Sequence, residues 1–239
     1  MAYRKIQTPL QVHSDLRQAV QCPAAALTLD ILVVFEGVEG CGKSYQSKKL
    51  YNKFKKKKID TILTREPGGT KSSELIRNLI LKDYFAKDSK EKFDKYTDTL
   101  LYLAARNEHI KNKIKPALLK KKIVICDRFI DSTLAYQVYG KKVDKNFINQ
   151  IHKFILRNIK PDLTFILKVS SVVSKLRLKK RKTKNRYDNF SKSFYTKAQN
   201  SFIKIAKNKR NYFVLNASHN NTDLENKIFK IVKNRLKIK

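Results

Sequence analysis

Short apolar runs, rich in β-branched side chains, alternate with longer amphipathic segments after about residue 30. The runs predict buried strands, which we place at residues 31–35, 60–64, 123–126, 163–169 and 212–215. The amphipathic segments predict helices, which we place at residues 43–56, 71–82, 95–119, 144–158, 171–184, 191–208 and 222–236. Pro116 has no backbone N–H, so we expect it to break the helix over 95–119.

This alternation predicts an α/β fold in which one five-stranded parallel sheet is flanked by helices. A length of 239 residues suits one large domain, expected over residues 31–239. Residues 1–30 differ from the rest, since Arg4, Lys5 and Arg17 are their only basic residues. We expect an N-terminal extension or leader that need not be ordered. It lacks the uninterrupted apolar core of a secretory signal.

The formal net charge of +34 has two interpretations. Basic runs at residues 55–58, 120–122 and 179–182 could form a nucleic-acid surface, or lysine could simply fill solvated positions throughout. The second interpretation fits better, because the runs are dispersed and none interleaves aromatic with basic residues. We therefore expect contact with nucleic acid to be non-specific only.

The cysteines and the hydropathy indicate the cellular compartment in which the protein works. Cys22, Cys41 and Cys126 show no metal-ligand spacing, which indicates reduced thiols. No apolar run approaches the roughly 18 residues of a membrane span. We therefore expect a cytoplasmic protein without a membrane partner.

A glycine-rich loop follows the first predicted strand. Residues 37–44 read GVEGCGKS, which matches G-x-x-x-x-G-K-[ST] between a strand and a helix. The glycines allow a tight turn whose N–H groups bind phosphate. Lys43 can reach the β- and γ-phosphates, and Ser44 can ligate Mg²⁺. The predicted ATP-type site, with Mg²⁺ as cofactor, comprises Gly37, Val38, Glu39, Gly40, Cys41, Gly42, Lys43 and Ser44.

Asp127 and Arg128 follow the strand predicted over 123–126. A carboxylate at this place can hold the Mg²⁺ shell, and an arginine can clamp a phosphate. The alternative is that Asp127 caps a turn while Arg128 is solvated. The neighbouring phosphate loop favours the metal and phosphate roles.

Three further groups of polar residues can be interpreted either as parts of a binding site or as ordinary structural residues. Residues 64–70 read TREPGGT and follow the second strand, either at a ligand-binding sheet edge or as a simple turn. Tyr102 and Arg106 can meet a nucleobase from one helix face, or Tyr102 packs in the core beside a solvated Arg106. Thr133 and Gln137 can contact base edges, or they belong to a capped helix start.

Together these motifs resemble those of bacterial-type thymidylate kinases. The matching runs, in the family's order and spacing, are FEGVEGCGKS (35–44), TREPGGT (64–70), ARNEH (105–109), CDR (126–128) and STLAYQ (132–137). The resemblance covers about residues 31–236. It implies the phosphate-loop NTPase fold with a helical lid, ATP and dTMP as substrates, and a homodimer.

The resemblance also implies roles for individual residues. Arg77 would contact the dTMP phosphate, and Tyr102 occupies the place of a phenylalanine that usually stacks on thymine. Tyr136 would disfavour a 2′-hydroxyl group. The implied dTMP site comprises Glu66, Pro67, Arg77, Tyr102, Arg106, Arg128, Thr133, Tyr136 and Gln137. The implied Mg²⁺ ligands are Ser44 and Asp127.

Residues 177–188 resemble the family's mobile lid, although a solvated basic helix is the alternative. The phosphate loop has no arginine in its middle, as in the bacterial subtype that takes its catalytic arginine from the lid. Arg181 is the first candidate and Arg186 the second, beside Lys43 and Arg128. The usual Asp-Arg-x-Glu reads Asn-Arg-Tyr-Asp here, and lysine, which cannot bind bidentately, replaces some lid arginines.

The implied reaction transfers the γ-phosphate of ATP to dTMP, giving dTDP for dTTP biosynthesis. One alternative is a kinase of the same fold that acts on another nucleotide or nucleoside. The other is a basic nucleic-acid-binding protein with a decayed kinase site. The intact Lys43, Ser44, Asp127 and Arg128 argue against decay.

Overall fold

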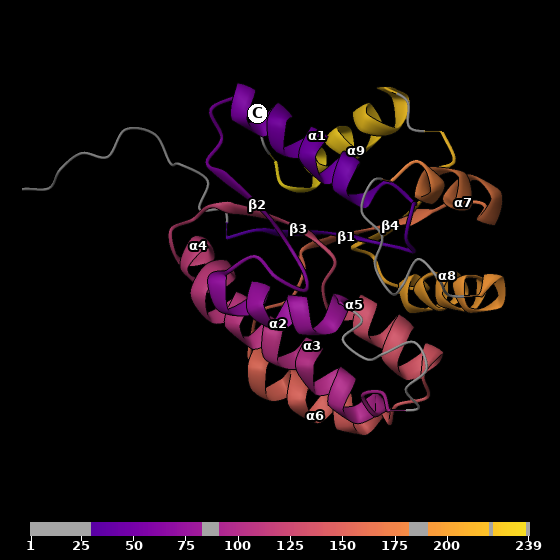
Figure 1. Ribbon diagram of the computed structural model, residues 1–239. Coiled ribbons are helices and arrows are strands. Elements are labelled where there is room, and N and C mark those ends of the chain that lie inside the picture. The colour runs from indigo at the N-terminus through magenta and orange to yellow at the C-terminus, as the bar shows by residue number, and fades with distance from the viewer. Residues whose placement is uncertain (1–29, 83–90, 182–190, 220–221, 238–239) are drawn as a thin grey trace, which may run out of the picture.

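The computed structural model describes residues 30–82, 91–181, 191–219 and 222–237. Within these residues, five parallel strands form one sheet in the order β2–β3–β1–β4–β5 (Figure 1). The strands are β1 (Leu32–Glu36), β2 (Thr61–Arg65), β3 (Ile123–Asp127), β4 (Leu163–Lys168) and β5 (Tyr212–Asn216). The predicted sheet is confirmed, and every strand end lies within one residue of its expected place.

Both faces of the central strand β1 are buried, which explains its continuous apolar sequence. Val33 and Phe35 lie in one hydrophobic cluster, and Leu32 and Val34 lie in another. All four side chains are at most 1 % exposed. Successive side chains of a strand point to opposite faces, so each face of β1 contributes to a separate part of the core.

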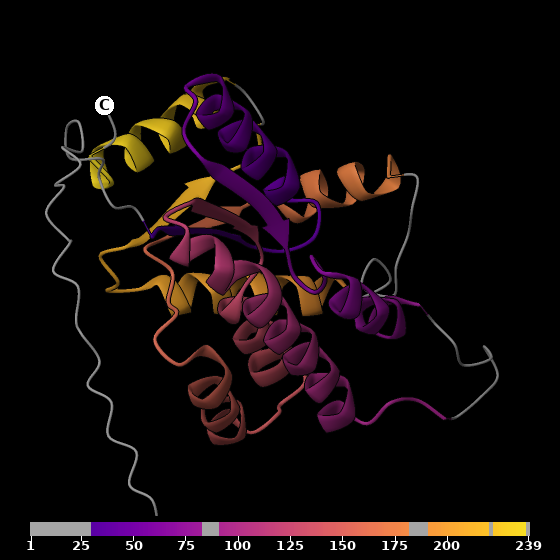
Figure 2. The same ribbon diagram turned by 90° about the vertical axis from the view of Figure 1, so that its left-hand side faces the viewer.

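Helices cover both faces of the sheet. They are α1 (Lys43–Lys56), α2 (Lys71–Leu81), α3 (Lys95–His109), α4 (Lys115–Leu119), α5 (Ile130–Thr133), α6 (Lys145–Leu156), α7 (Ser171–Lys179), α8 (Lys192–Ala206) and α9 (Thr222–Arg235). Two π-helical segments, η1 (Ile110–Ile114) and η2 (Leu134–Gly140), extend α3 and α5. Figures 1 and 2 show α1 and α9 on one side of the sheet, with α2, α3, α4 and α6 together on the other.

The expected break at Pro116 is wrong. The chain stays helical from α3 through η1 into α4, and Ile114 and Lys115 both have right-handed helical backbone angles. The wider π-helical turn shifts the hydrogen-bond register. Pro116 therefore falls in the first turn of α4, where a missing N–H removes no bond within that helix.

Other differences from the expected helices lie at their ends. The helix expected over 171–184 ends at Lys179, and residues 182–184 lie outside the described residues. The extension expected over 1–30 also lies outside them, apart from Asp30. No helix in the described part of the chain is long and apolar enough to cross a membrane.

The carboxyl ends of β1, β2 and β3 meet at one edge of the sheet. Asp127, the last residue of β3, pairs in register with Phe35 of β1 and with Arg65 of β2. The segments that leave these three strands therefore begin side by side. Open α/β sheets bind their ligands at this edge.

Candidate functional site

A cavity of about 420 Å³ lies where the segments that follow β1, β2 and β3 meet α3, η2 and α7. Most of the predicted site residues line it: Glu39, Gly40, Gly42, Lys43, Ser44, Glu66, Pro67, Arg77, Tyr102, Arg106, Asp127, Arg128, Thr133, Tyr136, Gln137 and Arg181. Gly37, Val38 and Cys41 belong to the same loop but do not line the cavity. Arg186 lies outside the described residues.

The loop of residues 37–44 has two glycines at which no side chain fits. A Cβ atom on Gly37 would lie 2.6 Å from the carbonyl oxygen of Leu167, and one on Gly40 would lie 2.7 Å from that of Ser174. Their φ angles of 136° and 72° are also in the region that favours glycine. The carboxyl end of β4 and the helix α7 therefore pack directly on the loop and fix its backbone.

Lys43 begins α1, as the sequence predicted. Its Nζ atom donates to the carbonyl oxygens of Gly37 and Val38 at 3.0 and 2.9 Å. The first turn of α1 has neither an acidic residue nor a side-chain cap. The N–H groups at this helix end are therefore free of side-chain acceptors, and an anion can bind them.

Ser44 and Asp127 meet beside the loop. The Ser44 hydroxyl group donates to Asp127 Oδ2. The other carboxylate oxygen, Oδ1, is buried and has no hydrogen-bond partner among the described residues. A hydroxyl group beside a carboxylate with an unused oxygen suits a hard cation, so these two residues fit Mg²⁺.

Arg128 is held by the phosphate loop. Its guanidinium group donates to Glu39 Oε1 at 2.7 Å and to the Gly37 carbonyl oxygen at 3.1 Å. The Tyr136 hydroxyl group donates to the second Glu39 oxygen at 2.7 Å, and the tyrosine ring lies 5.3 Å from the guanidinium carbon. The alternative of a solvated Arg128 is therefore wrong.

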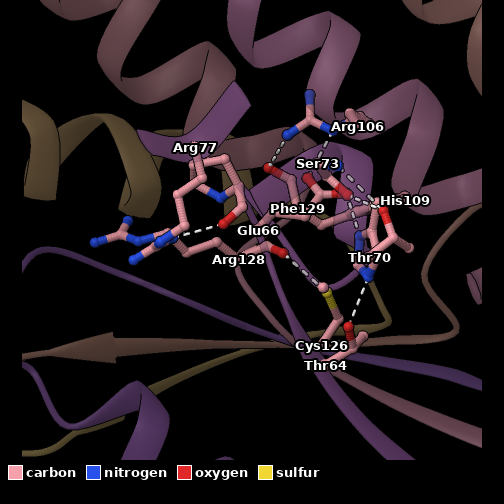
Figure 3. Close-up of polar contacts among 12 residues, drawn as sticks. Thr64, Glu66, Thr70, Ser73, Arg77, Arg106, His109, Cys126, Arg128 and Phe129 are labelled. Atoms are coloured by element: carbon pink, nitrogen blue, oxygen red, sulfur yellow. Dashed lines mark hydrogen bonds and ion pairs between the residues drawn. The ribbon is translucent and has the colours of Figure 1, made fainter. Parts of the chain in front are cut away.

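A buried ion pair forms another wall of the cavity. Arg106 Nε donates to Glu66 Oε2 at 2.8 Å, and the two side chains are 3 % and 4 % exposed (Figure 3). Burial opposes ionisation of Glu66, but Arg106 and His109 outweigh it and hold the pKa of this carboxyl below its usual range. Arg106 also donates to Thr133 Oγ1 at 2.7 Å. The alternative of a solvated Arg106 is wrong.

His109 supports this pair, although the sequence suggested no role for it. Its ring nitrogens lie 3.1 Å from Glu66 Oε1 and 2.6 Å from Thr64 Oγ1 (Figure 3). A Cβ atom on Gly69 would lie 2.6 Å from Thr64 Oγ1 and 2.7 Å from His109 Nε2. The run TREPGGT thus needs its second glycine because the backbone passes directly over the histidine. The place of His109 at the end of the run ARNEH was the available signal.

Glu36 is a second buried residue without a predicted role. Its Oε1 atom accepts from the backbone N–H groups of Phe129 and Ser132 at 2.8 and 3.1 Å, and its Oε2 atom accepts from the Ser132 hydroxyl group at 2.6 Å. Burial, reinforced by the charge of Asp131, raises the pKa of Glu36 to about 8. This carboxyl group caps α5 from the end of β1 and fixes Ser132 in the cavity wall.

The remaining predicted residues surround the same space. Arg77 donates to the Pro67 carbonyl oxygen at 2.5 Å (Figure 3). Tyr102 is half-buried and Gln137 is buried, and both line the cavity. Arg181 follows α7 and also lines the cavity, which brings one of the two candidate lid arginines to the site.

Comparisons with known proteins place this chain in one family. The thymidylate kinase family profile matches residues 35–228. The thymidylate kinase of Wolbachia sp. subsp. Brugia malayi is 44 % identical over 181 residues, which cover 74 % of this chain and 82 % of that protein. That of Orientia tsutsugamushi is 37 % identical over 219 residues, covering 88 % and 96 %. The crystal structure of thymidylate kinase from Ehrlichia chaffeensis aligns with a TM-score of 0.65 at 32 % identity, covering 84 % and 98 %. The chain therefore belongs to the thymidylate kinase family.

Proposed function

We propose that the protein transfers the γ-phosphate of ATP to dTMP, giving ADP and dTDP. The observation that carries this proposal is one cavity whose walls combine a phosphate loop with the buried Glu66–Arg106 pair. A triphosphate on the loop and a nucleotide at the pair would face each other near Arg128. Phosphoryl transfer depends mainly on positioning and charge, which such an arrangement supplies.

Residues 37–44 bind ATP in this proposal. The loop amides and the N-terminus of α1 hold the phosphates, and Lys43 exchanges its carbonyl partners for the β- and γ-phosphates. Ser44 and Asp127 would hold Mg²⁺. The cation supplies positive charge that offsets the negative charge of the phosphates during transfer.

The proposed dTMP site is the opposite wall. Arg77 and Arg128 provide donors for the dTMP phosphate, and the ring of Tyr102 is available to stack on thymine. Thr133 and Gln137, each 2 % exposed, contact the edge of the base. The full set is Glu66, Pro67, Arg77, Tyr102, Arg106, Arg128, Thr133, Tyr136 and Gln137.

Arginines complete the charge around the transferred group. A phosphate oxygen of dTMP is already a good nucleophile, so the reaction needs no strong general base. The proposed catalytic residues are Lys43, Arg128, Arg181 and Arg186. Arg181 is the first choice as the lid arginine because it lines the cavity. Arg177 lines it too, but its guanidinium group donates to the backbone carbonyl oxygens of Gly40, Ala217 and Ser218.

We also propose a cytoplasmic homodimer. Large apolar side chains are exposed on α2 and α3, which pack against each other: Leu75 is 70 %, Leu79 43 % and Leu100 47 % exposed. A second copy of the chain would bury this face. The free thiols of Cys41 and Cys126 agree with a reducing compartment.

A panel of acceptors tests the proposed reaction. ADP release from Mg-ATP would be measured with dTMP, dUMP, UMP, CMP and thymidine. We expect the highest kcat/KM with dTMP. A higher kcat/KM with another acceptor would replace dTMP as the substrate. No turnover with any acceptor, together with DNA binding that survives about 200 mM salt, would favour a nucleic-acid-binding protein.

A further inference from the structure

His152 lies in α6, far in sequence from every motif that points to the site. It is only 7 % exposed, and its Nε2 atom lies 2.8 Å from Arg106 Nη1. The contact is possible because α6 packs on α3, the helix that carries Arg106 (Figure 1). A residue outside the motifs thus reaches the buried ion pair.

The contact fixes the chemical form of the histidine. An arginine side chain can only donate hydrogen bonds, so Nε2 must accept and the ring proton must be on Nδ1. Burial and the adjacent charge of Arg106 lower the pKa of His152 to about 3, in agreement with a neutral ring. His152 is therefore a neutral acceptor that faces a buried cation.

Arg106 keeps one donor for a ligand. A guanidinium group has five N–H groups. Its Nε donates to Glu66, and its Nη1 donates to Thr133 and to His152. One Nη2 N–H group donates to the carbonyl oxygen of Phe129. The second Nη2 N–H group therefore has no acceptor among the described residues, and Arg106 lines the cavity.

We propose that His152 is a positioning residue for the acceptor nucleotide. By accepting from Nη1, it fixes the plane of the Arg106 guanidinium group, and so the direction of the remaining Nη2 donor and the place of Thr133 beside it. This inference rests on the proposed dTMP site. Without an acceptor at residue 152, a buried N–H group loses its partner and the guanidinium group turns to recover one.

Two substitutions separate positioning from packing. His152→Leu removes the acceptor at similar volume, whereas His152→Gln keeps an acceptor the same number of bonds from the backbone. Loss of a hydrogen bond to a charged group predicts a KM for dTMP about 10-fold or more above wild type in His152→Leu. The KM for ATP should stay within about twofold, and His152→Gln should restore the KM for dTMP to within about threefold of wild type.

Ile148→Val is the matched control on the same helix. Ile148 is fully buried and packs with Leu103 and Val143, so the variant should lower Tm and leave the KM for dTMP unchanged. Three results would overturn the proposal: an unchanged KM for dTMP in His152→Leu, an equal rise in the KM for ATP, or no recovery in His152→Gln.

The wild-type protein provides a test that does not depend on the folding of any variant. Histidine ¹⁵N spectra between about pH 6 and 8 should show His152 as the neutral Nδ1–H tautomer. A ring protonated on Nε2 would overturn the proposal. Different results would contradict the proposed function and the proposed positioning role of His152. Absence of dTMP turnover in the wild type contradicts the function, and an active wild type with a normal His152→Leu variant contradicts the positioning role.

Discussion

At the residue scale, the site is built from pairs of oppositely charged side chains that are buried or half-buried. Arg106 pairs with Glu66, and Arg128 pairs with Glu39. Removing one member of such a pair leaves the other charge without compensation, which costs more than the pair itself contributes. The arginines are therefore held in place before a ligand binds, and their direction is set by the carboxylates.

Asp127→Asn tests the cation site. The substitution removes the charge that faces Ser44 but keeps the shape of the side chain, so the Mg²⁺ concentration for half-maximal activity should rise about 10- to 100-fold. The exposed carboxylate of Asp60, which pairs with Lys122 at the surface, gives a matched control in Asp60→Asn. An Mg²⁺ titration that is identical for both variants would contradict the assignment.

Arg181→Ala and Arg186→Ala compare the two candidate lid arginines. An arginine that touches the transferred phosphoryl group contributes about 10³ to 10⁵ in rate in comparable reactions. We expect Arg181→Ala to lower kcat far more than Arg186→Ala, because Arg181 lines the cavity. Single-turnover rates measure the effect on the chemical step, and equal rates in the two variants would rule out this choice.

At the element scale, connections between segments distant in sequence complete the site. Glu36 at the end of β1 caps α5, which has no side-chain cap of its own. The guanidinium group of Arg177 in α7 donates to the carbonyl oxygens of Gly40 and Ala217 at 3.2 and 2.9 Å. The phosphate loop, α5 and α7 therefore depend on each other for their positions.

Glu36→Gln should remove a pH dependence of stability. The pKa of Glu36 is raised from 4.5 to about 8 in the folded chain, chiefly by burial and then by the charge of Asp131. The folded state keeps its proton where the unfolded state releases it. This stabilisation is therefore complete below pH 4.5 and is lost as the pH rises through about 8.

Urea unfolding across this pH range measures the effect. The free energy of unfolding of the wild type, minus that of Glu36→Gln, should fall as the pH rises from about 4.5 to about 8, because the amide does not titrate. Taking the difference removes the contribution of other groups, such as His152, whose lowered pKa makes stability rise with pH. Parallel pH profiles for the two proteins would show that Glu36 is not the titrating group.

The elements were predictable and several of their contacts were not. Apolar periodicity located every strand of the sheet, since a buried parallel strand such as β1 needs apolar side chains on both faces. The sequence did not predict that the helix continues past Pro116, because a π-helical turn has no sequence period of its own. The roles of His109 and His152 were not predicted either, because an isolated histidine acquires its role only when tertiary packing brings it to Glu66 or Arg106.

At the scale of the whole molecule, segments that are far apart in sequence together form the walls of the cavity. Residues from Glu39 to Arg181 line it, and the edge of the sheet brings them together. The motifs predicted this convergence because parallel strands end at one edge. Eight basic and three acidic residues line the cavity, so part of the basic charge lies at the site itself. The net charge of +34 should also make binding of polyanions sensitive to salt.

Leu75→Glu tests the proposed homodimer. A charge on the exposed apolar face of α2 and α3 should convert the dimer to a monomer, because a carboxylate would be buried there without a partner. Leu119→Glu on α4 is the matched control, since Leu119 is 71 % exposed and Leu75 is 70 % exposed. Light scattering after gel filtration reports the mass, and a wild type that runs as a monomer would contradict the dimer.

The most direct test of the central claim follows the phosphate itself. Protein incubated with ATP labelled at the γ-phosphate, Mg²⁺ and dTMP should yield labelled dTDP and an equal amount of ADP, with little labelled inorganic phosphate. Label that appears only in inorganic phosphate, or no label transferred to dTMP, would contradict a cavity built to bring the two nucleotides together.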